Sequence, residues 1–173
     1  MKILYVTTIG TTMGFFHSFI KELIDEGNTV DFACNSTISN VPECYRDLEC
    51  RIFNLSCTRS PLNRDNIRAY KQLKKMISEN HYDIVHCHTP VAGAITRLAC
   101  REYRKGGLKV IYTAHGFHFY KGAPLKNWLV YYPIEKFCSH FTDTLITINR
   151  EDYDLANKKM QVKLVWIWLL LKT

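Results

Sequence analysis

The chain has few of the residues that interrupt a packed domain and no apolar run long enough to cross a membrane. Its 173 residues include only five prolines and eight glycines, and no Pro/Gly/Ser-rich linker, repeat or low-complexity segment divides them. A transmembrane helix needs about 20 apolar residues, and the apolar run at residues 164–171 is far shorter. A single globular domain is therefore expected.

Signals for disulfides and for secretion are also missing. The seven cysteines are odd in number and form no Cys-x-x-Cys pair, and Cys34, Cys87 and Cys100 lie within apolar runs. This pattern favours buried, reduced thiols in a cytosolic protein over a disulfide framework. Met1 and Lys2 lead directly into residues 3–6, an apolar run too short for a signal-peptide core. We expect this run to be the first strand.

The basic residues are spread along the chain and give a net charge of +7. A solvated surface explains them, and attraction to anionic phosphates or to the inner face of a membrane is the alternative. No recognised nucleic-acid-binding motif accompanies the charge, so no nucleic acid partner is expected.

Apolar runs of strand length alternate with longer amphipathic segments, which is typical of βαβ units. Strands are predicted near residues 2–8, 29–34, 50–55, 83–88, 109–114 and 144–148. Helices are predicted at residues 13–26, 64–80, from Pro90 to the Gly106-Gly107 stop, 125–140 and 150–160, with Asn149 as the N-cap of the last. Residues 35–49 are predicted to be a loop with at most one helical turn. The predicted fold class is α/β with a parallel sheet.

Two glycines, Gly10 and Gly14, lie in the turn between the first strand and the first helix. The backbone amides of such a turn can approach a phosphate at a helix N-terminus, where the helix dipole favours negative charge. The segment is not Gly-x-Gly-x-x-Gly, and a plain tight turn explains Gly10 as well. Both interpretations stay open.

Histidines cluster where two predicted strands end. His86 and His88 are two residues apart on one strand, so they share a face while Cys87 points to the other, and Pro90 then opens a helix. In an open α/β sheet, ligands bind at the carboxyl ends of the strands. His88 is therefore predicted to line a site.

The richest candidate segment, residues 113–124, follows the predicted strand at residues 109–114. It holds His115, His118 and Lys121 among aromatic residues and glycines. Histidine can bind a sugar hydroxyl or a phosphate, and lysine can meet an anionic group. An ordered surface loop is the alternative. We predict that His115 is the catalytic residue and that His118 and Lys121 bind substrate.

A metal site is the alternative for the same histidines. A His-x-His pair with further histidines can hold zinc, but the carboxylates expected beside it are missing, since Asp83 begins its strand rather than ending it. No metal is predicted, and a metal-dependent hydrolase ranks third among the functions. A Gly-x-Ser-x-Gly elbow is also absent, which argues against acyl transfer.

Several of these segments together resemble one family. The segments are residues 2–6, 10–14, 23–30, 82–90 and 113–117. They resemble the N-terminal domain of family 4 glycosyltransferases, and the likeness spans about residues 1–160. It is strongest to bacterial enzymes of capsular polysaccharide, exopolysaccharide or lipopolysaccharide synthesis.

The resemblance implies a Rossmann-like doubly wound parallel sheet, corresponding to the N-terminal half of a two-domain GT-B enzyme with a retaining mechanism. It implies that this half binds the acceptor, often a lipid-linked saccharide at the inner membrane face, that a nucleotide-sugar is the donor, and that no cofactor is needed. By the same resemblance, Gly10 to Gly14 would approach the donor phosphates, His115 would lie near the transferred sugar, and His88 would line the cleft.

The chain departs from the family at two places. Met13 precedes Gly14 where many relatives have Gly-Gly, and after the helix at residues 150–160 relatives continue into a donor-binding domain. We therefore expect a domain at residues 1–160 and an apolar tail at 161–173 from truncation or a frameshift. The first hypothesis is an acceptor-binding half that is inactive alone. The second is a stand-alone binding module that acts with a separately encoded donor domain.

Overall fold

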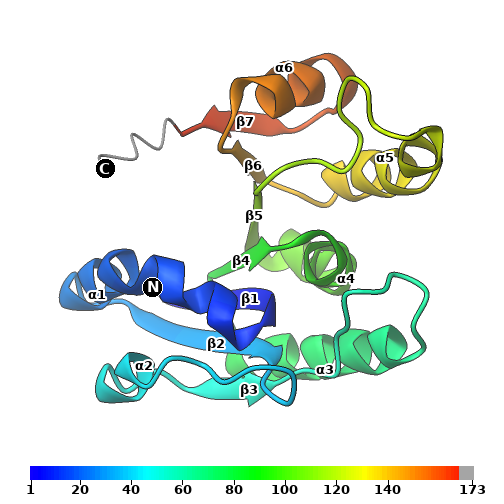
Figure 1. Ribbon diagram of the computed structural model, residues 1–173. Coiled ribbons are helices and arrows are strands. Elements are labelled where there is room, and N and C mark those ends of the chain that lie inside the picture. Colours follow the sequence, from blue (N-terminus) through cyan, green and yellow to red (C-terminus); the bar gives the residue numbers. More distant parts are fainter. Residues whose placement is uncertain (168–173) are drawn as a thin grey trace.

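The computed structural model describes residues 1–167, which form one parallel sheet with helices on both faces (Figure 1). The strands of these residues lie in the order β3-β2-β1-β4-β5-β6-β7, and every neighbouring pair is parallel. They are β1 (Lys2–Ile9), β2 (Thr29–Asn35), β3 (Ile52–Asn54), β4 (Ile84–His88), β5 (Lys109–Ala114), β6 (Thr144–Thr147) and β7 (Lys163–Trp166). The sheet is doubly wound, as predicted, because the chain runs outward from β1 to β3 and then returns to β4 on the other side of β1.

The helices between the strands are α1 (His17–Asp25), α2 (Cys44–Asp47), α3 (Asp65–Asn80), α4 (Pro90–Cys100), α5 (Leu125–Ser139) and α6 (Arg150–Lys159), with 3-10 segments η1 (Gly10–Phe16) and η2 (Tyr103–Gly106). Figure 1 shows α1 on one side of the sheet and α3 and α4 on the other. Asn149 caps α6 as predicted, since its side chain accepts a hydrogen bond from the Asp152 amide at 2.8 Å.

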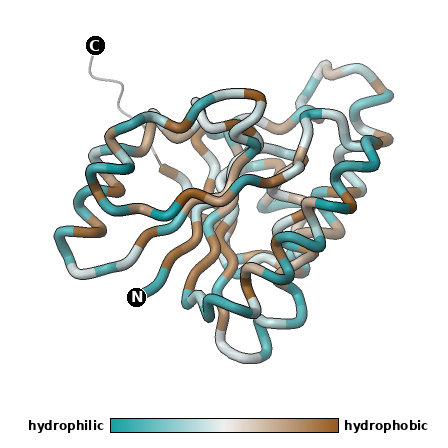
Figure 2. Tube along the Cα trace, turned by 90° about the horizontal axis from the view of Figure 1, so that it is seen from below, coloured by the Kyte–Doolittle hydropathy of each residue, from teal (hydrophilic) through white to brown (hydrophobic). Residues whose placement is uncertain are grey.

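Strand β1 is buried on both faces and therefore divides the apolar core in two. Ile3 and Tyr5 pack with α1 and α2, while Leu4 and Val6 pack with α3 and α4. This alternation follows from the two-residue period of a strand. In Figure 2 the apolar segments run along the central strands, and polar and apolar residues alternate along the helices.

The first predicted helix divides into two segments in the structure. Residues 13–16 belong to η1, and α1 begins only at His17. The Met13 carbonyl accepts a hydrogen bond from the Tyr45 hydroxyl at 2.6 Å, so this turn is held by a distant part of the chain. Similarly, α4 ends at Cys100, and the separate segment η2 completes the predicted helix.

Part of the predicted apolar tail belongs to the sheet. Residues 163–166 form β7, which pairs with β6 from Thr144 opposite Lys163 to Thr147 opposite Trp166. The sheet therefore extends past residue 160, the limit expected for the domain. Tail residues 168–173 lie outside the described residues. No helix within residues 1–167 is long and apolar enough to cross a membrane.

The seven cysteines are unpaired, and all except Cys44 are buried. Burial raises the pKa of Cys34 to about 12 and that of Cys57 to about 11. Thiols with such pKa values stay protonated near neutral pH and are weak nucleophiles. The expectation of free, buried thiols is confirmed.

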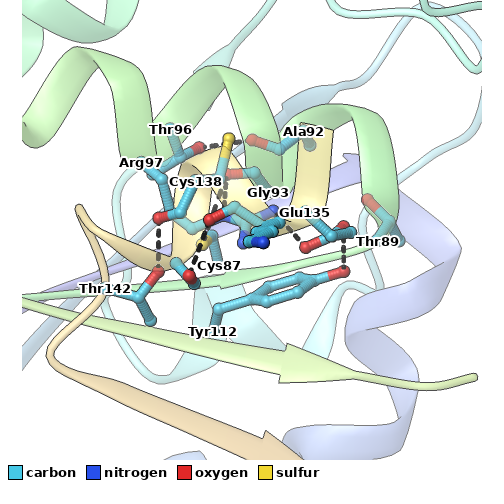
Figure 3. Close-up of polar contacts among 12 residues, drawn as sticks. Cys87, Thr89, Ala92, Gly93, Thr96, Arg97, Tyr112, Glu135, Cys138 and Thr142 are labelled. Carbon is cyan, nitrogen blue, oxygen red and sulfur yellow. Dashed lines mark hydrogen bonds and ion pairs between the residues drawn. The ribbon is translucent and has the colours of Figure 1, made fainter. Parts of the chain in front are cut away.

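A buried ion pair fixes α5 against α4 and β5 (Figure 3). Arg97 of α4 lies 2.8 Å from Glu135 of α5, and their side chains are 2% and 6% exposed. The Tyr112 hydroxyl of β5 donates to Glu135 at 3.2 Å, and its ring lies 4.0 Å from the Arg97 guanidinium. Burial alone would lower the pKa of Arg97, but the charge of Glu135 outweighs it and raises that pKa. Since an unpaired buried charge is very costly, α5 is held with Glu135 inward.

Candidate functional site

The carboxyl ends of β1 and β4 form the switch point of the sheet, where the chain leaves in opposite directions. A crevice of about 220 Å³ opens there. Its lining comes from the end of β1, from η1, from the residue after β4 and the start of α4, from the loops after β3 and β5, and from α5. The residues are Thr8, Ile9, Thr12, Arg59, Thr89, Pro90, Val91, His118 and Tyr131. Ligands of open α/β sheets bind at such a point, so this crevice is the candidate binding site.

Thr89 ties the two strand ends together in a strained conformation. Its φ of 65° and ψ of 145° are unusual for a β-branched residue. Its hydroxyl lies 2.6 Å from the Thr8 hydroxyl and donates to the His88 carbonyl at 2.5 Å. Strain of this kind costs about 1–3 kcal/mol and clusters at functional sites. The strained backbone of Thr89 therefore supports the assignment of the crevice as the candidate binding site.

Three of the four predicted histidines gather at the carboxyl ends of β4 and β5, and none of the three lines the crevice. His88 Nδ1 lies 3.1 Å from His115 Nε2, and the ring of His86 lies 4.3 Å from that of His88. Tyr5 stacks on His88 at 5.8 Å, and Phe16 of η1 packs on it at 4.5 Å. The predicted shared face of His86 and His88 is confirmed, and the two rings lie in an aromatic stack.

The environment keeps these imidazoles neutral. Burial, with a smaller effect of His115, lowers the pKa of His86 to about 3. Burial and then the neighbouring His86 and His115 hold the pKa of His88 well below its usual value, and partial desolvation lowers the pKa of His115 although its side chain is exposed. A neutral imidazole has one donor and one acceptor nitrogen. The cluster is therefore suited to hydroxyl groups rather than to forming a fixed cationic site.

His88 has an unused polar atom. Its side chain is 1% exposed, and its Nε2 finds no hydrogen-bond partner within residues 1–167. His86, by contrast, uses its Nε2 with the Thr113 hydroxyl at 2.8 Å. A buried polar atom without a hydrogen-bond partner costs about 1–3 kcal/mol. Such atoms are rare in native structures, and one in a candidate site indicates a functional role.

The two glycines of the predicted phosphate-binding turn differ in their surroundings. Gly10 is buried, and a Cβ there would come within 2.8 Å of the Asn40 backbone, so packing alone requires glycine. Gly14 faces open space, with only a Pro42 side-chain atom at 3.8 Å. Of the two glycines, Gly14 is the one whose backbone a ligand could approach.

His118 and Lys121 do not join the histidine cluster. His118 lines the crevice instead and packs on Tyr131 of α5 at 4.5 Å. The side chain of Lys121 is exposed, and its backbone amide donates to Glu151 at 3.0 Å. Lys121 thus lies at the surface of the loop that carries His115.

Of the nine residues that line the crevice, only His118 is a predicted site residue, and Arg59 is the charged residue among the other eight. Arg59 lies in the loop after β3 and supplies the guanidinium of the crevice. The sequence signal that could have identified Arg59 is its position in a loop that starts at the carboxyl end of a parallel strand. The loop shows no periodicity that would have singled out Arg59.

A metal centre finds no support in the structure. No group of three or more His, Cys, Asp or Glu side chains within residues 1–167 is arranged to hold a metal ion. A metal-dependent hydrolase is therefore not supported by this part of the chain.

The doubly wound sheet with its crevice at the switch point defines a Rossmann-like domain of the kind found in GT-B enzymes. A family model described as Glycosyl transferase 4-like matches residues 2–149. The chain belongs to this family, as the sequence resemblance predicts.

Two relatives and one solved structure illustrate the likeness. "Putative glycosyltransferase EpsD" of Bacillus subtilis (strain 168) is 50% identical over 153 residues, covering 88% of this chain and 39% of the relative. The Escherichia coli UDP-Gal:alpha-D-GlcNAc-diphosphoundecaprenol alpha-1,3-galactosyltransferase is 32% identical over 120 residues, covering 68% and 30%. The chain therefore spans well under half the length of these relatives.

The solved structure is the UDP-GlcNAc 2-epimerase from Neisseria meningitidis bound to UDP-GlcNAc. It matches 95% of this chain and 45% of its own with a TM-score of 0.66 and 15% identity. At this identity the likeness shows the fold alone.

Proposed function

We propose that the chain is the acceptor-side half of a retaining glycosyltransferase that moves a sugar from a nucleotide-sugar to a lipid-linked saccharide at the inner face of the membrane. The observation that carries the proposal is the neutral His88–His115 pair at the carboxyl edge of the sheet, the edge at which the switch-point crevice also opens. The names of the relatives support it, since one of them is a galactosyltransferase with a UDP-Gal donor and a diphosphoundecaprenol-linked acceptor.

In this proposal His115 is the catalytic residue that contacts the transferred sugar. The ring of His115 is exposed, and its Nε2 is hydrogen-bonded to His88 Nδ1. The other ring nitrogen of His115 is therefore left for a sugar hydroxyl. Because both imidazoles are neutral, the contact is a hydrogen bond whose strength can differ between ground state and transition state. His88 positions His115, and the reaction needs no cofactor.

The remaining predicted residues are assigned to the two substrates. The backbone of Gly14 approaches the donor phosphates, with Gly10 shaping the same turn, and His118 binds the acceptor within the crevice. Arg59 in the crevice and the exposed Lys121 meet the acceptor's anionic groups. Arginine is well suited to phosphate because its guanidinium donates two parallel hydrogen bonds.

The crevice also supports the proposal that the chain is inactive alone. Its volume of about 220 Å³ is smaller than the roughly 300–1,000 Å³ of typical ligand pockets, which bury most of the ligand surface. A second domain would have to supply the opposite wall and most of the donor contacts. The chain alone should therefore bind donor weakly.

The test is a titration of the ¹⁵N-labelled chain, followed through its histidine ring signals. UDP-galactose and a water-soluble N-acetylglucosamine-diphosphate lipid analogue are the probes, and the His115→Ala variant is compared with the exposed control His140→Ala. The acceptor analogue should shift the ring signals of His88 and His115 in wild type and in the His140 variant. The shift at His88 should shrink in the His115 variant.

Two outcomes would contradict the proposal. If neither probe moves the histidine signals up to its solubility limit, the site assignment is wrong. If the purified chain transfers labelled galactose to an extracted membrane lipid acceptor at a steady rate, the proposed inactivity of the chain alone is wrong.

A further inference from the structure

Thr89 has a backbone conformation that its place in the sequence disfavours. It precedes Pro90, and the residue before a proline is restricted to φ of about −120° and ψ of about +120° to +160°. The ψ of Thr89, 145°, lies within this range, but its φ of 65° lies in a region that favours glycine. The strain is therefore confined to one angle, the rotation about the N–Cα bond of Thr89.

A turn of one peptide would remove this strain. When the peptide plane between His88 and Thr89 rotates by about 180°, only the ψ of His88 and the φ of Thr89 change. The φ of Thr89 goes from 65° to about −115° while its ψ stays at 145°, which is the conformation preferred before proline. Because His88 is the last residue of β4, the turn leaves the pairing of the earlier residues of the strand in place.

The hydroxyl of Thr89 holds this peptide in its present orientation. It donates to the His88 carbonyl at 2.5 Å and lies 2.6 Å from the Thr8 hydroxyl. The net contribution of one hydrogen bond to stability is small, and a strained φ costs a comparable amount. The two orientations of the peptide are therefore close in free energy, which is the condition for a switch that a ligand can bias.

The turn changes what the crevice offers to a ligand. The C=O and N–H of a peptide point in opposite directions, so the turned Thr89 N–H takes the direction of the present His88 carbonyl, beside the hydroxyls of Thr8 and Thr89. Both threonines line the crevice together with Arg59, and none of the nine lining residues is acidic. The turn thus replaces an acceptor by a donor in a crevice that already holds a guanidinium.

We propose that the His88–Thr89 peptide is a two-state switch that turns its N–H into the crevice when a phosphate group binds beside Arg59. Phosphate oxygens accept hydrogen bonds from the N–H and from the guanidinium, whereas the carbonyl of the unturned peptide repels them. The inference rests on the proposed function only in taking the acceptor's diphosphate as the source of the phosphate. Since His88 contacts His115 at 3.1 Å, the switch couples phosphate binding to the residue that positions His115.

The test is isothermal titration calorimetry of the full chain with inorganic pyrophosphate. Thr89→Gly relieves the strain of the unturned peptide, so turning costs more and pyrophosphate should bind about tenfold more weakly. Thr89→Val keeps the β-branched strain but lacks the hydroxyl that holds the carbonyl, so it should bind about fivefold more tightly. The control His81→Gly relieves another positive φ, 53°, at the end of α3 and outside the crevice, and should not change the affinity.

The turn itself is measured by the nuclear Overhauser effect between the His88 α proton and the Thr89 amide proton. This signal is strong while His88 is extended, as at the end of β4, and weak once the turn takes its ψ out of the extended region. It should weaken when pyrophosphate is added to wild type. Without ligand, it should already be reduced in Thr89→Val and stay strong in Thr89→Gly.

Damage to the fold would weaken binding in both Thr89 variants, whereas the switch predicts changes in opposite directions. The proposal is overturned if wild type does not bind pyrophosphate, if Thr89→Val binds more weakly than wild type, or if His81→Gly binds as weakly as Thr89→Gly. It is also overturned if the Overhauser signal does not change on binding.

Competition identifies the source of the phosphate. The N-acetylglucosamine-diphosphate lipid analogue should displace pyrophosphate from the crevice, and displacement by UDP-galactose alone would contradict the assignment to the acceptor. Pyrophosphate carries no sugar, so its failure to bind would overturn the switch without affecting the proposed contact between His115 and a sugar.

Discussion

Acid should destabilise the fold through its buried histidines. An imidazole in the unfolded chain has a pKa of about 6.5, whereas burial lowers the pKa of His86 to about 3. Below pH 6.5 the unfolded state therefore binds more protons than the folded state, and the free energy of unfolding falls with the pH. The loss begins near pH 6.5 and ends only when His86 becomes protonated in the fold near pH 3.

The size of the effect follows from the two pKa values. At pH 5, one and a half units below the unfolded pKa, protonation stabilises the unfolded chain by about 2 kcal/mol for one histidine. Folded His86 takes up almost no proton at this pH, so the whole of this amount is lost from the free energy of unfolding. His88, whose pKa is also well below the usual value, acts in the same direction.

Urea unfolding at pH 7 and pH 5 measures this loss. His86→Gln is the variant, because a glutamine amide reaches toward Thr113 as Nε2 does but does not titrate. Between pH 7 and pH 5 the variant should lose about 2 kcal/mol less than wild type. The exposed control His140→Gln should lose as much as wild type.

The comparison concerns the change between the two pH values, so any stability that the variant loses at pH 7 does not affect it. The reasoning is refuted if His86→Gln and wild type lose the same free energy between pH 7 and pH 5. That result would mean that His86 is protonated in the folded state.

Two further predictions concern the packing of α4. A Cβ on Gly93 would lie 2.7 Å from the ring of Tyr112, so Gly93→Ala should lower the free energy of unfolding by about 1–3 kcal/mol. The control is Gly106→Ala, whose Cβ meets open space and should leave stability unchanged. Equal melting temperatures for the two variants would contradict the close packing of Gly93 on Tyr112. Glu135→Gln should cost about 3–5 kcal/mol because it leaves the Arg97 charge buried without its partner. Adding Arg97→Met should restore most of that loss in urea unfolding, and a double variant as unstable as Glu135→Gln would show that the unpaired charge is not the cause.

Strands were easier to predict from the sequence than the segments that join them. An apolar run bounded by polar residues identifies β1, β4 and β5 locally, because both faces of such strands are buried. The 3-10 segment η1 depends on a hydrogen bond between Met13 and Tyr45, 32 residues apart. The place of β7 depends on pairing with β6. Neither contact leaves a pattern in nearby residues.

The same distinction holds for the site. The alternation of side chains along a strand predicts that His86 and His88 share a face. Their meeting with His115 depends on the register of β4 on β5, in which His88 lies opposite Thr113, and no local pattern encodes this register. Arg59 reaches the crevice from a loop without periodicity. Local rules thus identify candidate residues, and only the tertiary structure shows which of them meet.

The hydrogen bond between His88 and His115 couples the tautomers of the two rings. If His88 Nδ1 donates, His115 Nε2 accepts, so the outer nitrogen of His115 carries a proton and the buried Nε2 of His88 carries none. If His115 donates instead, both assignments reverse. A ligand that accepts a hydrogen bond from His115 and a ligand that donates one to it would thus select opposite tautomers of the buried His88, without moving a heavy atom.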